Sequence, residues 1–181
     1  MNLRKLEPQD VEAFWSLRLK SLKEHPESFG SNYEDASLTG MDEVRRRFPN
    51  SADQFLLGAF EENGELMGMI GFRRESYRNL AHKGMLWGVY VDSAHQGKGI
   101  ATALLRHVLE EVSSLDGLEQ VYLAVVTVNE PAVRLYRSAG FEIFGTEPNA
   151  LKIGGEYYDE YWMVCKLEMT DSRSESGWLK R

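Results

Sequence analysis

The sequence predicts one mixed α/β domain, an α+β arrangement in which helices pack on a mixed sheet. Its 181 residues, 43% hydrophobic and 27% charged, fit one domain with a substantial core. The apolar spacing alternates along the chain between the period of a helix and the period of a strand. No internal repeat or linker interrupts this pattern before a polar, serine-rich end. We therefore expect a single domain over residues 1–168 and a polar tail over residues 169–181.

The N-terminal segment is expected to form a short strand and two helices. "LRKLEP" is typical of a strand, and residues 8–25 then place apolar side chains at helical spacing, with a proline in the first turn. The polar, turn-rich segment 25–40 is expected to be a surface loop, and "MDEVRRRF" a short helix after it. Phe29 and Tyr33 of the loop either anchor it to the core or line a substrate mouth.

The middle of the chain is expected to form three strands and a helix. "QFLLGAFEENGELMGMIGFRRE" has two apolar runs around Asn63-Gly64, which is a strong signal for a hairpin turn. A third strand is expected over residues 83–91. The helix after it has one apolar face, formed by Ile100, Leu104, Val108, Val112 and Leu115.

The last third is expected to complete the sheet. "LEQVYLAVVTV" is a nearly continuous apolar run, which favours a strand covered on both faces. "EPAVRLYRSAG" predicts a helix with Pro131 in its first turn and Gly140 at its end. "FEIFGT" and "LKIGGEYYDEYWMVCKLEM" predict the final strands, the second with a turn at Gly154-Gly155.

Composition excludes several classes of protein. A net charge of −7 and the lack of a long Lys/Arg run argue against a general nucleic-acid binder. No window approaches the roughly 18 apolar residues of a membrane span, and the N-terminus lacks the apolar core of a signal peptide. The single cysteine, Cys165, rules out an internal disulfide and metal clusters of the C-x-x-C kind. We expect a soluble, cytoplasmic protein without a metal site.

The joint between the strand at residues 83–91 and the following helix has the composition of an anion site. Glycines let a phosphate approach the backbone closely, and the first N–H groups of a helix have no internal partners. "HQGKGIAT" does not fit a P-loop, because Ile100 follows Gly99 and no glycine precedes at the required spacing. It fits a dinucleotide fingerprint poorly, because Thr102 takes the last place. The pattern [RQ]-x-x-G-x-[GA] is satisfied at every place by residues 96–101.

Residues 96–101 resemble motif A of the GCN5-related N-acetyltransferases, the GNAT superfamily. "LWGVYVDSAHQGKG" resembles the fourth strand of that family, and "VVTVNEPAVRLYRSAGFEIFG" resembles its motif B about thirty residues later. The similarity covers roughly residues 55–167. It implies a central, mostly antiparallel mixed sheet flanked by helices, with the loop and first helical turn around the pyrophosphate of acetyl-CoA. The cofactor-binding residues implied are Val89, Tyr90, Val91, Gln96, Gly97, Lys98, Gly99, Ile100, Ala101, Asn129 and Tyr136.

The resemblance also implies roles for these residues. The main chain of Val89–Val91 would pair with the pantetheine arm, and one of its N–H groups would stabilise charge on the thioester oxygen. Tyr136 would donate a proton to the leaving thiol, although a core tyrosine fits the same pattern. Asn129 would contact the cofactor arm, cap the next helix, or do both. Lys98 would attract phosphate or remain an ordinary solvated lysine.

The general base is less well defined. The candidates are His82, Glu156, Asp159 and Glu160, and a water chain is a further alternative. We assign Glu160 as the catalytic base, and because alternate side chains of a strand face opposite ways, Asp159 cannot share its face. Aromatic side chains near the acceptor end are Trp87, Tyr157, Tyr158 and Tyr161, of which we expect one or two to line the pocket.

We therefore expect an acetyl-CoA-dependent N-acetyltransferase, an acyltransferase acting directly on a primary amine of a small molecule, peptide or protein. One alternative is a catalytically silent acetyl-CoA-binding sensor. Another is a nucleotide-dependent enzyme that would prefer ATP or NAD. Exposed strands and Trp178 in the tail also suggest a homodimer.

Overall fold

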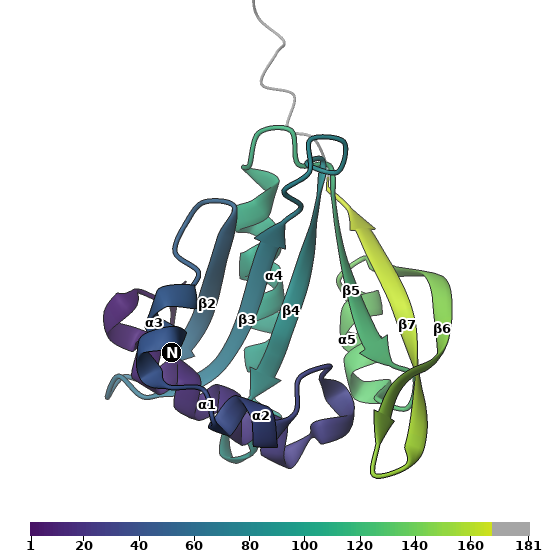
Figure 1. The fold of residues 1–181 in the computed structure, drawn as a ribbon. Helices are drawn as coiled ribbons and strands as arrows, with labels where there is room; N and C mark the ends of the chain where they lie inside the picture. The colour runs from purple at the N-terminus through teal and green to yellow at the C-terminus, as the bar shows by residue number, and fades with distance from the viewer. Residues whose placement is uncertain (168–181) are drawn as a thin grey trace, which may run out of the picture.

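A seven-stranded sheet forms the centre of the computed structural model, which describes residues 1–167 (Figure 1). Its strand order is β1-β2-β3-β4-β5-β7-β6, and all neighbours are antiparallel except the parallel pair β4 and β5. The expected mixed, mostly antiparallel sheet is confirmed. The strands are β1 Asn2–Lys5, β2 Gln54–Phe60, β3 Leu66–Arg74, β4 Lys83–Val91, β5 Gln120–Val126, β6 Glu142–Ile153 and β7 Glu156–Lys166.

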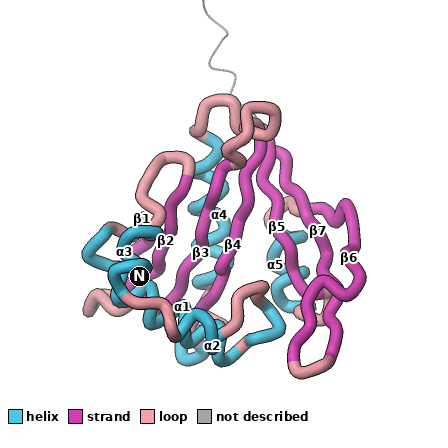
Figure 2. The backbone as a smooth tube through the Cα atoms, in the orientation of Figure 1, coloured by secondary structure: helices cyan, strands magenta, loops and turns pink. Residues whose placement is uncertain are grey.

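Helices cover both faces of this sheet (Figure 2). Helices α4 and α5 lie on one face, and α1, α2 and α3 lie on the other (Figure 1). The helices are α1 Val11–Glu24, α2 Tyr33–Ser37, α3 Met41–Arg47, α4 Ile100–Ser113 and α5 Glu130–Ser138, with 3-10 turns η1 Pro8–Asp10, η2 Pro26–Ser28 and η3 Ser93–His95. No helix within residues 1–167 has the length and apolar character needed to cross a membrane.

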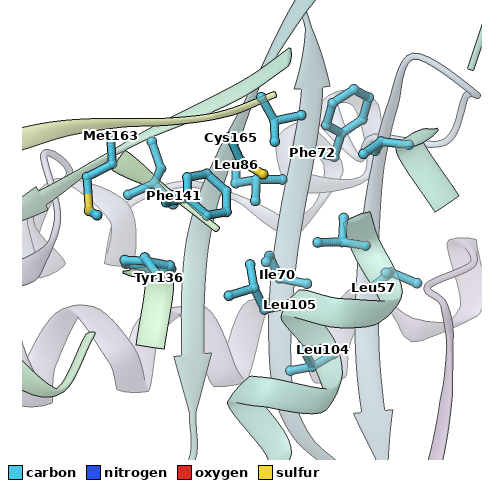
Figure 3. Packing of buried hydrophobic residues seen from close by; sticks show 14 of the residues in the cluster. Leu57, Ile70, Phe72, Leu86, Leu104, Leu105, Tyr136, Phe141, Met163 and Cys165 are labelled. Carbon is cyan, nitrogen blue, oxygen red and sulfur yellow. The ribbon is translucent and has the colours of Figure 1, made fainter. Parts of the chain in front are cut away.

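Two hydrophobic clusters, one on each face, hold the layers together. Leu56 and Leu57 are both fully buried, and because adjacent strand residues point to opposite faces, they join different clusters. The larger cluster lies between the sheet and helices α4 and α5, where Leu104 and Leu105 of α4 pack near Ile70 of β3 (Figure 3). The central strands are therefore fixed from both sides, and this rigidity positions the ends of β4 and β5.

Glycines form the expected turns. Gly64 has φ +89° between β2 and β3, where the Glu61 N–H donates to the Glu65 carbonyl oxygen over 2.9 Å. Gly154 and Gly155, with φ +59° and +92°, connect β6 to β7. Gly140, with φ +90°, follows the end of α5. Because left-handed backbone strongly favours glycine, these boundaries were predictable from local sequence.

Several details differ from the sequence prediction. Helix α1 begins at Val11, because the preceding residues form the 3-10 turn η1. The expected loop over 25–40 contains η2 and α2, and α2 begins where Asn32 Oδ1 accepts a hydrogen bond from the Asp35 N–H over 2.7 Å. The segment 142–153 is one long strand with two irregularities in its pairing. The predicted tail and Trp178 lie outside the described residues.

Strand β5 is also less covered than predicted. Val121, Leu123 and Val125 are buried against the α4 side, but Tyr122 and Ala124 on the opposite face are only half-buried. Residues 123–126, from both faces of the strand, line a cleft between β4 and β5. The continuous apolar run of β5 thus reflects a cleft wall as well as a core strand.

Candidate active site

The parallel strands β4 and β5 separate after three paired positions. Their register joins Lys83 to Gln120, Gly84 to Val121 and Met85 to Tyr122, and no further pair follows. Beyond this point the facing edges of both strands have unpaired N–H and C=O groups, and the strands diverge in Figure 1. A cleft of about 650 Å³ opens between them. Such an edge can accept an extended chain as an additional strand.

A bulge in β4 shapes one wall of this cleft. The pairing with β3 shifts register between Trp87 and Tyr90, and Gly88 between them has φ +63°. Residues Val89–Val91 follow the bulge and line the cleft. The Tyr90 side chain is turned away, because it is buried under α1 and its hydroxyl donates to Glu24 Oε2 over 2.6 Å. The backbone of this segment, rather than its tyrosine ring, is therefore what β4 offers to a ligand.

The glycine-rich loop lies in the same cleft. Gly97 and Gly99 have φ +75° and +76°, and a Cβ on either would meet no atom within 4 Å. Glycine is thus favoured by backbone conformation, and open space remains beside it. The first turn of α4 closes when the Ala103 N–H donates to Gly99 O over 3.0 Å, so the preceding three N–H groups of the helix have no partner within it. Gln96 Nε2 donates to Val91 O over 3.1 Å and ties the loop to β4.

The structure brings most of the predicted cofactor residues together. Those that line the cleft are Val89, Tyr90, Val91, Gln96, Gly97, Gly99, Ile100, Ala101, Asn129 and Tyr136. Lys98 is the exception, because it lines a separate depression beside Glu61 and Glu62 of the β2–β3 turn. The structure does not bring the Lys98 side chain to the main cleft, and its assignment to the cofactor stays a prediction.

Asn129 lies where α5 begins. Its Oδ1 accepts a hydrogen bond from the Ala132 N–H over 3.2 Å, which satisfies one of the unpaired donors of the helix. The helix cap foreseen as one alternative is therefore present. Because capping uses only the amide oxygen, the Nδ2 group remains available on a side chain that lines the cleft.

Tyr136 of α5 also lines the cleft, from the side opposite β4. Its ring is buried and packs edge-on against Phe141, with ring centroids 5.9 Å apart (Figure 3). Burial raises the pKa of its phenol well above the usual value. The hydroxyl therefore stays protonated at neutral pH and can donate a hydrogen bond.

Glu160 of β7 is half-buried and is paired across the strands with Val126 of β5, which lines the cleft. Glu160 itself is outside the cleft lining. Burial raises the pKa of its carboxyl, and the nearby Glu147 carboxylate raises it further. A raised pKa suits a general base, so the position and the electrostatics are compatible with the prediction without testing it.

The other candidate bases have different surroundings. Asp159 Oδ1 accepts from the Asn149 N–H over 2.8 Å and so supports β6. His82 precedes β4 at the end where β4 and β5 remain paired, and its carbonyl accepts from the Glu119 N–H over 2.7 Å. Glu156 accepts from the Tyr158 hydroxyl beside the β6–β7 turn. None of these three lines the cleft.

The segment around η2 completes the site, and of its residues sequence reasoning considered Phe29 but missed His25 and Glu27. His25, Glu27 and Phe29, in and beside η2, line the cleft from the α1 side, and η2 contacts β5 and β6. Phe29 also packs against the smaller hydrophobic cluster, so it has both roles considered for it. Of the aromatic candidates, Trp87 lines the cleft. Within residues 1–167 no group of three or more His, Cys, Asp or Glu is arranged to hold a metal ion.

Comparison with known families identifies the architecture. A family model described as the acetyltransferase (GNAT) family matches residues 18–141, which include the glycine loop, Asn129 and Tyr136. Among curated proteins, the chain is similar to an L-amino acid N-acetyltransferase of Escherichia coli, with 36% identity over 78 residues. This match covers 43% of the chain and 48% of that protein, so the chain spans about half of that relative's length.

Solved structures show the same fold. A GNAT-family acetyltransferase of Streptococcus pneumoniae superimposes with a TM-score of 0.81 and 25% identity, covering 91% of this chain and 98% of that one. A Salmonella typhimurium protein of the same fold, whose structure was solved with its cofactor acetyl-CoA, superimposes with a TM-score of 0.77 and 23% identity. The match covers 93% of this chain and 94% of that one. Both likenesses extend over nearly all of the described domain.

Proposed function

The chain belongs to the GNAT family of acetyltransferases, and from this premise we propose that it transfers an acetyl group from acetyl-CoA to a primary amine of a small molecule, peptide or protein. The observation that carries the proposal is the continuity of the cleft. It joins the glycine loop at the start of α4, the unpaired edges of β4 and β5, and the hydroxyl-bearing ring of Tyr136. We also propose that the enzyme acts in the cytoplasm, since a single cysteine is typical of proteins in a reducing compartment.

The residues present fit acetyl-CoA in three respects. Gly97 and Gly99 leave open space beside unpaired helix-opening N–H groups, which suits a pyrophosphate. The free edges of the separated strands suit an arm that contains amide groups, because it can hydrogen bond as a strand does. The cleft volume of about 650 Å³ is in the range of small-molecule sites.

The chemistry needs no covalent enzyme intermediate. When bound, acetyl-CoA supplies a thioester that the acceptor nitrogen attacks, so that a C–N bond forms and the C–S bond breaks. A backbone N–H in Val89–Val91 stabilises the negative charge that develops on the carbonyl oxygen. The acceptor nitrogen loses a proton to Glu160, and Tyr136 donates one to the leaving thiolate, whose conjugate thiol has a pKa of about 8.5. Cys165 takes no part, because it is buried on β7 beside the paired end of β5.

Binding of acetyl-CoA and release of free thiol test the proposal directly. A ligand at about 100 times its Kd stabilises a folded protein by about 2.7 kcal/mol, which for this chain length raises Tm by roughly 5–10 °C. We expect that rise with acetyl-CoA and a smaller or no rise with ATP or NAD. Acceptor-dependent thiol release from a panel of amines should follow. A Tm rise without release for any amine would instead support the silent sensor.

Glu160 is the base in this proposal, and its role predicts a pH profile. A base acts when deprotonated, so kcat/KM should be lost as pH falls through its pKa, and the raised pKa places this limb above the ordinary glutamate value of 4.5. Glu160→Gln should lower kcat/KM by roughly 10²–10⁴-fold and remove the limb.

Glu147 provides the matched control. Its carboxylate raises the pKa of Glu160, so Glu147→Gln should shift the acid limb to lower pH while the plateau stays within a few-fold. The glutamine can still accept the hydrogen bond from Trp162 Nε1. A Glu160→Gln enzyme with an unchanged plateau and limb would show that another group or water accepts the proton.

A further inference from the structure

Arg18 of α1 is a buried cation that lies over the Phe29 ring but has no ion-pair partner within residues 1–167. It and Ser21 are the buried polar or charged residues of the described chain, and Arg18 is only 9% exposed. Its Nη1 has no hydrogen-bond partner, and no carboxylate in residues 1–167 forms an ion pair with it. Burial lowers the pKa of the guanidinium to about 10, so the group still carries its charge at neutral pH. A buried charge without a counter-ion is unfavourable, which calls for a reason to retain it.

Two carboxylates close to α1 are already engaged by other groups. Lys20 Nζ lies 2.7 Å from Asp92 Oδ2, and Glu24 accepts from the Tyr90 hydroxyl. Elsewhere, Arg4 pairs with Asp10 at 2.6 Å. Arg18 therefore lacks the carboxylate partner that Lys20 and Arg4 have. Its counter-ion is not supplied by the part of the chain that the structure describes.

Arg18 is not itself part of the cleft lining, but its guanidinium lies directly behind two residues that are. Its central carbon lies 4.6 Å from the centroid of the Phe29 ring, and Phe29 lines the cleft. Its Nη1 would lie 3.8 Å from a Cβ on Gly88, which lines the cleft and has none. Because residue 88 is a glycine, no side chain fills the space between its backbone and Nη1. Gly88 directly precedes Val89–Val91, so the Arg18 guanidinium lies beside the part of β4 that we expect to face the thioester.

We propose that Arg18 binds a carboxylate of the acceptor, so that the acceptor is an amino acid or a similarly small amine with a carboxylate close to its nitrogen. The proposal rests on the proposed acetyltransfer and specifies its substrate class. A planar guanidinium matches a carboxylate with two parallel hydrogen bonds, which orients as well as attracts. Glu27, two residues before Phe29, lines the same cleft and provides an acidic neighbour for the amine.

Three series of acceptors test this substrate class: free L-amino acids, their α-amides and the corresponding decarboxylated amines. Thiol release at saturating acetyl-CoA gives kcat/KM for each. We expect the free amino acids to exceed their amides by roughly 10- to 100-fold, the worth of a charge-assisted pair. This comparison underestimates the effect of the carboxylate, because the α-amino group of an amide is less basic and is therefore more often in the neutral, reactive form.

Arg18→Met separates recognition from structure. Methionine keeps an unbranched stem against Phe29 but removes the charge. The ratio of acid to amide kcat/KM should fall to about one, through KM of the acids, while the amides react as before. The Tm of the unliganded variant should stay equal or rise, because an uncompensated buried charge is removed. Arg106→Met on the exposed side of α4 is the control for loss of a positive charge.

The outcomes distinguish this proposal from the acetyltransfer on which it rests. Amides or decarboxylated amines that react as well as free amino acids would overturn it while confirming acetyltransfer. So would an Arg18→Met enzyme with a lower Tm and an unchanged acid-to-amide ratio, since Arg18 would then be structural. A wild-type protein whose Tm does not respond to acetyl-CoA would instead refute the cofactor assignment, and the substrate class would fall with it.

Discussion

Gly99→Glu is expected to abolish acetyl-CoA binding. Gly99 lies at the start of α4 with φ +76°, beside open space and three helix-opening N–H groups. A glutamate there would place a carboxylate where a pyrophosphate is expected, so the loss combines steric exclusion, charge repulsion and competition for the N–H donors. We expect Kd to rise at least about 100-fold, which corresponds to about 2.7 kcal/mol. Isothermal titration with acetyl-CoA would measure it.

Gly117→Glu is the matched control for Gly99→Glu. Gly117 also has a left-handed backbone, with φ +70°, and it lies just beyond the opposite end of α4. Both substitutions place a glutamate in left-handed backbone, which costs about 1–2 kcal/mol in stability, and a Cβ at Gly117 would also lie 3.4 Å from Arg74 Nη2. Only the first should affect the ligand. Equal Kd values for the Gly99 variant and the wild type would refute the anion site in this loop.

The sequence predicted elements best where local physics alone decides them. The hairpin at Asn63-Gly64 and the end of α5 at Gly140 depend on backbone conformations that glycine adopts readily, with φ +89° and +90°. The strand over 83–91 was predicted with its observed bounds. The glycine loop was equally accessible, because its anion-binding character resides in consecutive residues.

The acceptor side could not be predicted in the same way. Arg18 occupies one position of an amphipathic helix, and its burial depends on Phe29 and on the bulge at Gly88, seventy residues further along the chain. No local sequence pattern indicates that Arg18, Phe29 and Gly88 lie together in the fold. Glu27 was hidden in a polar segment typical of a surface loop, yet η2 crosses to β5 and β6. The position of Lys98 beside the β2–β3 turn, which is distant in sequence, likewise could not be read from its own loop.

Tyr136→Phe is expected to lower kcat by roughly 10²–10⁴-fold, the usual range for loss of a general acid. The phenylalanine fits, because the ring is already packed against Phe141 and only one oxygen is removed. Stability and acetyl-CoA affinity should therefore change little, and the defect should appear in kcat. Steady-state thiol release together with titration of acetyl-CoA separates the two quantities.

Tyr122→Phe shows whether the effect belongs to the cleft or to buried tyrosines in general. Burial and the hydrogen bond to Glu75 raise the pKa of Tyr122 to about 12, so it too stays neutral, but it does not line the cleft. Its loss should leave kcat within a few-fold. If both variants lost the same activity, the chemistry would not need a donor at 136. Each variant loses one hydroxyl from a neutral tyrosine, and only Tyr136 lines the cleft. If only Tyr136→Phe were slow, with its Kd unchanged, the proton to the leaving thiolate would therefore come from α5.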